Sequence, residues 1–212
     1  MTGDITMQKK QNKNISLKNV QVQDGFWKPM QDLIIETVIP YQEKILNDEI
    51  PGVEKSHALA NFRIAAGMEK GEFYGMVFQD SDVAKWLEAV AYSLVVHPDA
   101  ELEKRADEVI ETIEKAQQED GYLNTYFTIK EPEHRWQNLQ ECHELYCAGH
   151  MMEAAVAYYD ATGKDKLLKV MERMADHIDR RFGPDKITGI PASLASCRID
   201  SHPVSTTGSR MI

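Results

Sequence analysis

One pattern of helix and turn occurs twice along the chain and limits the folds that it can adopt. Residues 88–92 (Glu-Ala-Val-Ala-Tyr) and 154–158 (Ala-Ala-Val-Ala-Tyr) lie in alanine-rich stretches, and a short break and a more charged helical stretch follow each of them. The tyrosines of the two copies, Tyr92 and Tyr158, are 66 residues apart. A repeat of this length with two helices per unit is typical of stacked helical hairpins. The sequence therefore predicts an all-α protein of stacked helical hairpins, which can form either an α/α toroid or a plain helical solenoid.

Apolar residues at helical spacing place six helices on the chain. They are expected at about residues 29–47, 57–68, 80–95, 101–116, 141–159 and 166–181. Paired in order, they make three hairpins, or about half of a closed toroid. Residues 15–22, in which Ile15 and Leu17 alternate with polar neighbours, predict a short N-terminal strand. The segment 120–123 is interpreted as a turn with Gly121 at positive φ.

Composition divides the chain into three parts. Residues 1–13 are polar and are expected to form a disordered lead, whereas residues 14–191 are expected to form the N-terminal part of a barrel domain. Residues 192–212 are rich in Ser and Thr and lack helical or strand periodicity, so they are predicted to form a disordered tail. A half-toroid exposes apolar helix edges, so we expect the chain to be the front part of something larger.

The overall composition excludes several classes of partner. The chain has 212 residues, a net charge of -10 and a pI of about 5.2, whereas a nucleic-acid-binding surface needs clustered Lys and Arg. No apolar run reaches the roughly 18 residues of a membrane span, and the start lacks the apolar stretch of a secretory signal. Three cysteines are too few for a disulfide framework. We expect a cytoplasmic protein that binds neither nucleic acid nor membrane.

Two long loops, each of which precedes an inner helix, carry the candidate site residues. Partial positive charge and unpaired N–H groups gather where inner helices of a toroid begin. Aromatic, amide and carboxylate side chains suit a sugar, because a sugar has apolar C–H faces and a rim of hydroxyl groups. An alternative interpretation makes Asp80 or Ser81 a helix cap. The predicted substrate-binding residues are Tyr74, Gln79, Asp80, Asp82, Trp136 and His143.

The spacing assigns neither a metal site nor a catalytic pair of carboxylates. His143, Cys147 and His150 recur at i, i+4 and i+7, but one helix supplies only part of a tetrahedral shell, and the pattern is not His-Glu-x-x-His. We therefore expect Cys147 and His150 to pack within the inner layer, and no metal ligand is predicted. A catalytic pair of carboxylates is recognised by the distance between the two groups, and the sequence does not give this distance. The candidates by position are Asp80, Asp82, Glu141 and Glu144.

Four motifs, in order and with matching spacing, make residues 26–191 similar to glycoside hydrolase family 127, the β-L-arabinofuranosidases. The motifs lie at residues 56–61, 76–88, 116–123 and 143–150. The resemblance implies an (α/α)6 barrel followed by β-domains. It also implies a retaining exo-hydrolase that releases L-arabinose from the non-reducing ends of β-linked arabinosides. In that family, three cysteines and a glutamate hold a zinc ion around a cysteine nucleophile, and another glutamate is the acid/base.

Few of the family's functional residues have a counterpart in the present chain. His143 matches a family histidine that contacts the sugar. The family's zinc ligands, nucleophile and catalytic glutamates lie past the matched segment, so the resemblance implies no catalytic residue and no bound zinc in residues 1–212. Cys142, Cys147 and Cys197 are not their counterparts. After residues 189–191 the sequence departs abruptly from the family pattern, and this chain alone is expected to be inactive.

Other partners and functions fit the same pattern. The resemblance implies an oligosaccharide or arabinoside as substrate and leaves a homodimer open for the full-length protein. A helical repeat without catalytic residues also suits a binding scaffold or a sugar-binding module. A third option is an α/α-barrel lyase or unsaturated-glycuronide hydrolase, which would use acidic and His residues of the same inner helices without zinc.

Overall fold

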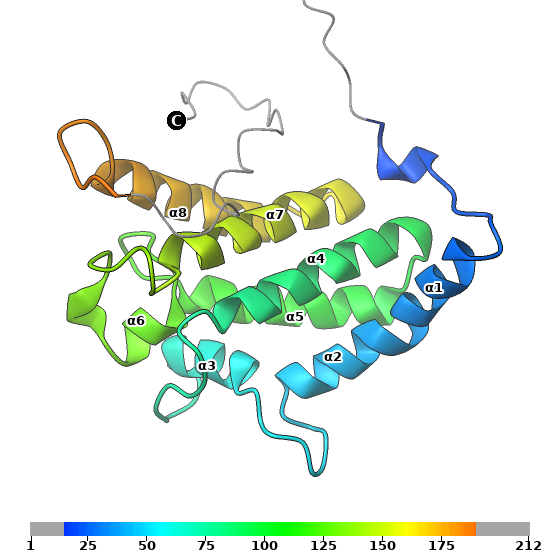
Figure 1. Ribbon diagram of the computed structural model, residues 1–212, viewed down its shortest axis with the longest axis horizontal. Helices are drawn as coiled ribbons and strands as arrows, with labels where there is room; N and C mark the ends of the chain where they lie inside the picture. Colours follow the sequence, from blue (N-terminus) through cyan, green and yellow to red (C-terminus); the bar gives the residue numbers. More distant parts are fainter. Residues whose placement is uncertain (1–14, 190–212) are drawn as a thin grey trace, which may run out of the picture.

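The computed structural model describes residues 15–189, which fold into a layered array of helices (Figure 1). The predicted disordered segments, 1–13 and 192–212, lie outside the described residues. None of the helices within the described range has the length and apolar character needed to cross a membrane. The helices are α1 (Trp27–Leu33), α2 (Ile39–Leu46), α3 (Ala58–Ala65), α4 (Asp80–Val96), α5 (Ala100–Ala116), α6 (Thr125–Ile129), α7 (Glu144–Thr162) and α8 (Lys166–Arg181), with a π-helical turn η2 (Ile34–Val38) and short 3-10 turns η1 (Leu17–Asn19) and η3 (Pro132–His134).

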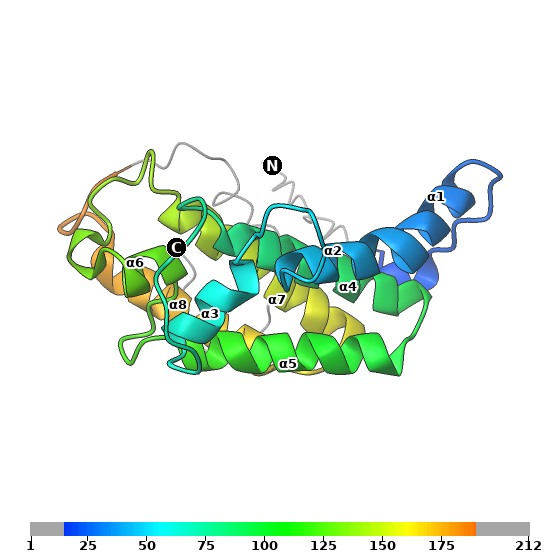
Figure 2. The same ribbon diagram turned by 90° about the horizontal axis from the view of Figure 1, so that it is seen from below.

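Within residues 15–189 the long helices α4 and α5, and α7 and α8, pair into hairpins, as the repeat predicts, and α2 and α3 precede them in the chain. The inner helices α2, α4 and α7 lie side by side, and so do the outer helices α3, α5 and α8. In Figure 2, α5 forms one side of the array and α2 and α4 the other. The all-α partial toroid expected from the sequence is confirmed.

Residue patterns explain the two layers. The outer helix α5 buries one stripe at helical spacing, and Lys and Glu side chains cover the rest of its surface. Asp99 caps this helix, since its carboxylate accepts hydrogen bonds from the N–H groups of Glu101 (2.9 Å) and Leu102 (3.0 Å). The inner helix α7 is buried on several sides, and small residues let α4 approach it closely. Its buried residues include Cys147, Ala148, Gly149, Met151, Ala154, Ala155 and Ala157.

The predicted strand at residues 15–22 is wrong. Leu17–Asn19 form a single 3-10 turn, which the side chain of Ser16 caps by accepting a hydrogen bond from the N–H of Lys18. Ile15 and Leu17 are exposed. Apolar alternation makes a strand only where a partner strand completes the hydrogen bonds, and no strand of the described residues lies beside this segment.

The first predicted helix extends from α1 through η2 to α2 and widens in the middle. The N–H of Ile39 donates to the carbonyl of Ile34, a bond one residue longer than in an α-helix. Pro40 follows at once; it has no N–H to donate, and its ring crowds the preceding turn. A π-turn relieves this crowding and lets the helix continue. The short elements α6 and η3 lie in the segment before α7 that the sequence predicts to be a loop, so neither of them was predicted.

One flank of the array is apolar and exposed. It is formed by α1 and η2, and a groove of about 450 Å³ separates this segment from α4. The residues that we call the apolar flank are Phe26, Trp27, Met30, Leu33, Ile34 and Val38, all of them more than a third exposed.

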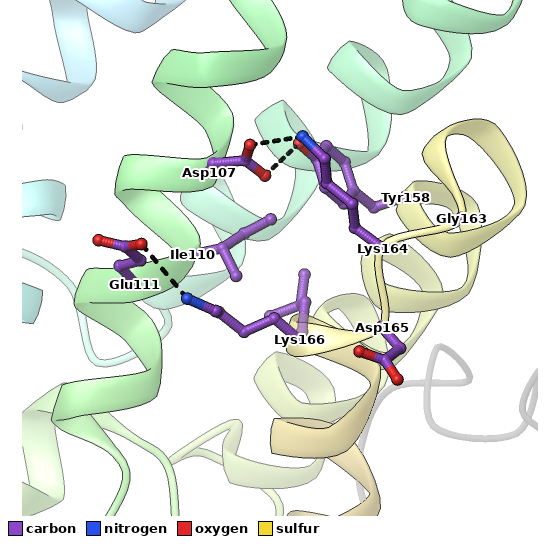
Figure 3. Close-up of a pocket in the computed structure, with 9 residues that line it drawn as sticks. Asp107, Ile110, Glu111, Tyr158, Gly163, Lys164, Asp165 and Lys166 are labelled. Carbon is purple, nitrogen blue, oxygen red and sulfur yellow. Dashed lines mark hydrogen bonds and ion pairs between the residues drawn. The ribbon is translucent and has the colours of Figure 1, made fainter.

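On the outer layer, polar contacts fasten the turn between α7 and α8 to α5 (Figure 3). Lys164 donates to Asp107 (2.6 Å), and the hydroxyl of Tyr158 donates to the same carboxylate (2.8 Å). Lys166 donates to Glu111 (3.3 Å). These side chains line a pocket of about 460 Å³. Because its ion pairs are largely exposed to water, each contributes little to stability, and we interpret the pocket as part of the hairpin junction.

Candidate functional site

Side chains from the first turns of α4 and α7, and from the loops before them, form a cluster at one end of the inner layer. We call Phe78, Asp82, Lys85, His143 and Tyr146 the inner cluster. The ring of His143 lies 5.3 Å from that of Phe78 and 5.6 Å from that of Tyr146, between centroids. The ammonium of Lys85 donates to the hydroxyl of Tyr146 (2.8 Å). Aromatic faces and groups of both charges therefore lie together.

The backbone fixes the orientation and the tautomer of His143. This residue is the N-cap of α7 and has the left-handed conformation (φ 55), which few non-glycine residues adopt. Its Nδ1 lies 2.6 Å from the carbonyl oxygen of Glu141. A carbonyl can only accept, so Nδ1 carries the hydrogen, and Nε2 of the neutral ring keeps a lone pair. His143 can therefore accept a hydrogen bond from a sugar hydroxyl.

Gln79 orients the carboxylate of the cluster. Its amide nitrogen donates to Asp82 (2.9 Å), and its amide oxygen accepts from the N–H of Met76 (3.2 Å). Desolvation raises the pKa of Asp82, and the charge of Lys85 opposes this shift. The predicted residues Gln79, Asp82 and His143 thus lie in or beside the inner cluster.

Two members of the inner cluster, Lys85 and Tyr146, are not among the site residues predicted from the sequence. Both follow a predicted site residue by three positions, Asp82 in one case and His143 in the other. Residues three apart lie on the same helix face. Helical spacing applied to the candidates themselves would have found them.

The structure places Asp80 beneath the cluster, in a structural role. Its carboxylate accepts hydrogen bonds from the N–H (2.8 Å) and the hydroxyl of Thr125, so it fastens α4 to α6. Desolvation raises the pKa of Asp80 to about 6, although the Thr125 bonds oppose the shift. The interpretation of Asp80 or Ser81 as the cap is wrong, because the N-cap of α4 is Gln79, which makes no side-chain capping bond.

Trp136 and Tyr74 also lie apart from the inner cluster. Trp136 is buried, and its indole N–H donates to Nε2 of His177 (3.1 Å). Nδ1 of His177 in turn donates to the carbonyl of Asp120 (3.1 Å), so this chain of bonds joins the loop before α7 to α8. Tyr74, in the loop between α3 and α4, packs its ring at a tilt against that of His57 (4.5 Å between centroids). The structure does not bring either aromatic ring to His143.

The candidate carboxylates at and just before the start of α7 differ in burial. Glu141 is exposed and accepts a hydrogen bond from Asn138 (3.1 Å). Glu144 is 1% exposed and accepts from the hydroxyl of Tyr122 and from the N–H of Trp136 (2.8 Å). Desolvation raises the pKa of Glu144 to about 7, whereas the two hydrogen bonds act in the opposite direction. Glu144 therefore gains a proton near neutral pH.

This shift predicts a specific pH dependence of stability. Between pH 4.5, the ordinary value, and about 7, the folded state keeps a proton on Glu144 that the unfolded chain has lost. The free energy of unfolding therefore falls as pH rises through this window, by up to about 3 kcal/mol for this group. Glu144→Gln should remove that contribution. Urea unfolding of wild type and variant at several pH values measures the difference, and Glu141→Gln is the exposed control. If the free energy of unfolding depends on pH in the same way in the wild type and in Glu144→Gln, the pH dependence does not come from Glu144.

The thiol and the histidines of α7 do not come together as a metal site. Cys147 is buried, and desolvation raises the pKa of its thiol well above the ordinary range. His143 donates to the backbone of its own loop, whereas His150 lies next to Glu153, with Nδ1 3.4 Å from the carboxylate. The expectation that Cys147 and His150 pack within the inner layer agrees with this placement.

Comparison with known proteins identifies the relatives of the chain. The family model for the GH127 catalytic domain of β-L-arabinofuranosidases matches residues 19–191. A non-reducing end β-L-arabinofuranosidase of Bifidobacterium longum subsp. longum is 46% identical over 184 residues, which cover 79% of this chain and 28% of that protein.

Solved structures share the same arrangement of helices. The crystal structure of a GH127 β-L-arabinofuranosidase from Geobacillus stearothermophilus T6 matches with a TM-score of 0.81 and 61% identity, over 82% of this chain and 28% of that one. A second GH127 β-arabinofuranosidase matches with a TM-score of 0.74 and 33% identity, over 84% and 29% of the two chains. The present chain thus spans less than a third of the length of these relatives.

Proposed function

Since the chain belongs to glycoside hydrolase family 127, we propose that it forms the N-terminal part of the barrel of a retaining, exo-acting β-L-arabinofuranosidase. The observation that carries the proposal is the 46% identity to an enzyme named for this activity. The inner cluster supports it with a histidine acceptor, aromatic rings, a lysine and an aspartate, groups that suit a sugar. The family match favours this function over an α/α-barrel lyase or unsaturated-glycuronide hydrolase.

A substrate panel tests the proposal. The longer protein that contains residues 1–191 should release L-arabinose from a β-L-arabinofuranosyl chromogenic substrate. The α-L-arabinofuranosyl isomer and a β-D-galactofuranoside are the controls. If the protein cleaves one of the controls and not the β-L-arabinofuranoside, the assigned sugar or linkage changes. A well-folded protein that cleaves none of the three substrates would overturn the proposal.

His143 is proposed to bind and position the sugar. In the longer enzyme, His143→Ala should lower kcat/KM by about 10–100-fold, the effect of one or two hydrogen bonds with roughly 1–3 kcal/mol in total. His97→Ala, in the exposed turn after α4, is the matched control. Zinc content should be the same in all three proteins. Stoichiometric loss of zinc in His143→Ala would show that His143 is a metal ligand instead.

The zinc ion implied by the family resemblance does not fit the described residues. Two cysteines, Cys142 and Cys147, lie within residues 15–189, and a set of three thiolates and a glutamate cannot be formed from them. Cys197 lies outside the described range. In the proposed enzyme the zinc ligands and the catalytic glutamates therefore belong to a part of the protein beyond this chain. A cytoplasmic location and the absence of nucleic-acid and membrane partners remain predictions.

A sugar-binding module is the second candidate, because the inner cluster could hold a sugar without the catalytic groups. Calorimetry of residues 1–212 with L-arabinose discriminates between the two functions of this segment. Measurable heat that disappears in His143→Ala would favour binding by the chain alone. If residues 1–212 give no heat of binding with L-arabinose, the segment would instead be a part of the barrel that binds sugar only within the longer enzyme.

A further inference from the structure

Farther along the same two inner helices, three side chains that can ligate a metal converge. Glu88 lies on α4, and His150 and Glu153 lie one turn apart on α7. One ligand atom from each of the three lies within 4.8 Å of the other two, and all three side chains are partly buried. The close packing of α4 on α7 brings them together. Spacing along a single helix could not reveal this group, because Glu88 comes from another hairpin.

We propose that Glu88, His150 and Glu153 bind one divalent transition-metal ion, with Zn²⁺ as the preferred ion. The donor set is one imidazole nitrogen and carboxylate oxygens. Zinc accepts such nitrogen and oxygen ligands in proteins, whereas Mg²⁺ and Ca²⁺ select sites built from oxygen alone. Two carboxylates balance the charge of the ion, and three protein ligands leave a coordination position for water or a substrate oxygen.

Neighbouring side chains orient two of the three ligands. The hydroxyl of Tyr92 donates to Oε1 of Glu88 (3.0 Å), so it holds this carboxylate in place. The ring of Tyr146 meets that of His150 edge to face, 4.5 Å away between centroids. Hydrogen bonds and packing of this kind around first ligands strengthen metal sites.

The surroundings of the group are electrostatically negative. The carboxylates of Glu88, Glu153 and Asp160 all act on the hydroxyl of Tyr92, which lies beside the group. A cation would be attracted to such a surface. The ordinary explanation for part of the group is an ion pair between His150 and Glu153, which lie three apart on one helix. That pair does not account for the convergence of Glu88 from α4.

Metal titration of the 212-residue chain tests the proposal. After treatment with a chelator, the protein is titrated with Zn²⁺ and, separately, with Mg²⁺ by calorimetry. We expect one Zn²⁺ per chain and much weaker binding of Mg²⁺. Glu88→Gln, His150→Asn and Glu153→Gln should each weaken Zn²⁺ binding by at least about 100-fold, because loss of even an outer-shell partner typically costs 10–100-fold. Glu172→Gln, exposed on α8, is the control and should bind as wild type does.

Two further measurements keep the proposal open to refutation if a ligand variant unfolds. Tyr92→Phe keeps the ligands and should weaken Zn²⁺ binding by about 10-fold, as expected for an outer-shell residue. Co²⁺ bound to the wild-type chain should give the visible spectrum of nitrogen and oxygen ligands. A Co²⁺ spectrum with a thiolate charge-transfer band would place the metal on a cysteine and overturn the proposal. No Zn²⁺ binding by the wild type, or equal binding by all folded variants, would also overturn it.

Discussion

Gly121→Ala is expected to destabilise the protein by more than about 3 kcal/mol, an effect well above that of an average substitution. Gly121 has φ +90, in the region that favours glycine, and a Cβ at this position would lie 2.4 Å from the backbone carbonyl oxygen of Arg173. This oxygen belongs to α8 and cannot rotate away. Alanine therefore adds a backbone clash to the roughly 1–2 kcal/mol that a left-handed residue with a side chain costs.

Gly163→Ala separates the two contributions. Gly163, at the end of α7, has φ +77, but no atom lies within 4 Å of the position of its Cβ. Alanine there should cost only the backbone term of about 1–2 kcal/mol. Urea unfolding followed by circular dichroism measures both variants. Equal losses would mean that the turn at Gly121 moves away from α8 at little cost, and that the close approach does not determine stability.

The layered helical architecture could be predicted because one signal recurs along the chain. The alanine-rich stretches around Tyr92 and Tyr158 became the inner helices α4 and α7, and the charged stretches after them became the outer helices α5 and α8. The turn at Gly121 has the positive φ that its sequence predicts. The prediction failed at residues 15–22, where apolar alternation has no neighbouring strand to pair with. It also failed at α6, a short helix inside a segment predicted to be a loop.

The candidate site was only partly predictable, because sequence does not show which loop side chains turn inward. Gln79 and His143 lie immediately before inner helices and Asp82 lies in the first turn of one, and the structure places all three in or beside the inner cluster. Asp80 has the same carboxylate as Asp82, and Trp136 lies in the loop before α7 as His143 does, but both are buried and bonded to other elements, Asp80 to α6 and Trp136 to α8. The group of Glu88, His150 and Glu153 depends on the register between two helices, which no spacing within one helix records.

Residues 1–212 expressed alone are expected to be helical but to self-associate. The apolar flank leaves large side chains in water, among them Trp27 (63% exposed) and Ile34 (47% exposed). Contiguous apolar patches of more than a few hundred Å² are rare on monomers and drive association. Circular dichroism should show a helical spectrum, and sedimentation velocity should show dimers or larger species whose proportion rises with protein concentration. No glycosidase activity is expected from this chain.

Charge placed on the apolar flank should reverse the association. Ile34→Lys puts an ammonium group where apolar surfaces would meet, so the variant should sediment mainly as a monomer at concentrations where the wild type associates. Val53→Lys is the matched control, since Val53 is a similarly exposed aliphatic residue (44%) in the loop between α2 and α3. It should associate as the wild type does. A wild-type chain that is a monomer at all concentrations and melts sharply would contradict the prediction, because the apolar flank would then be stable in water without a partner.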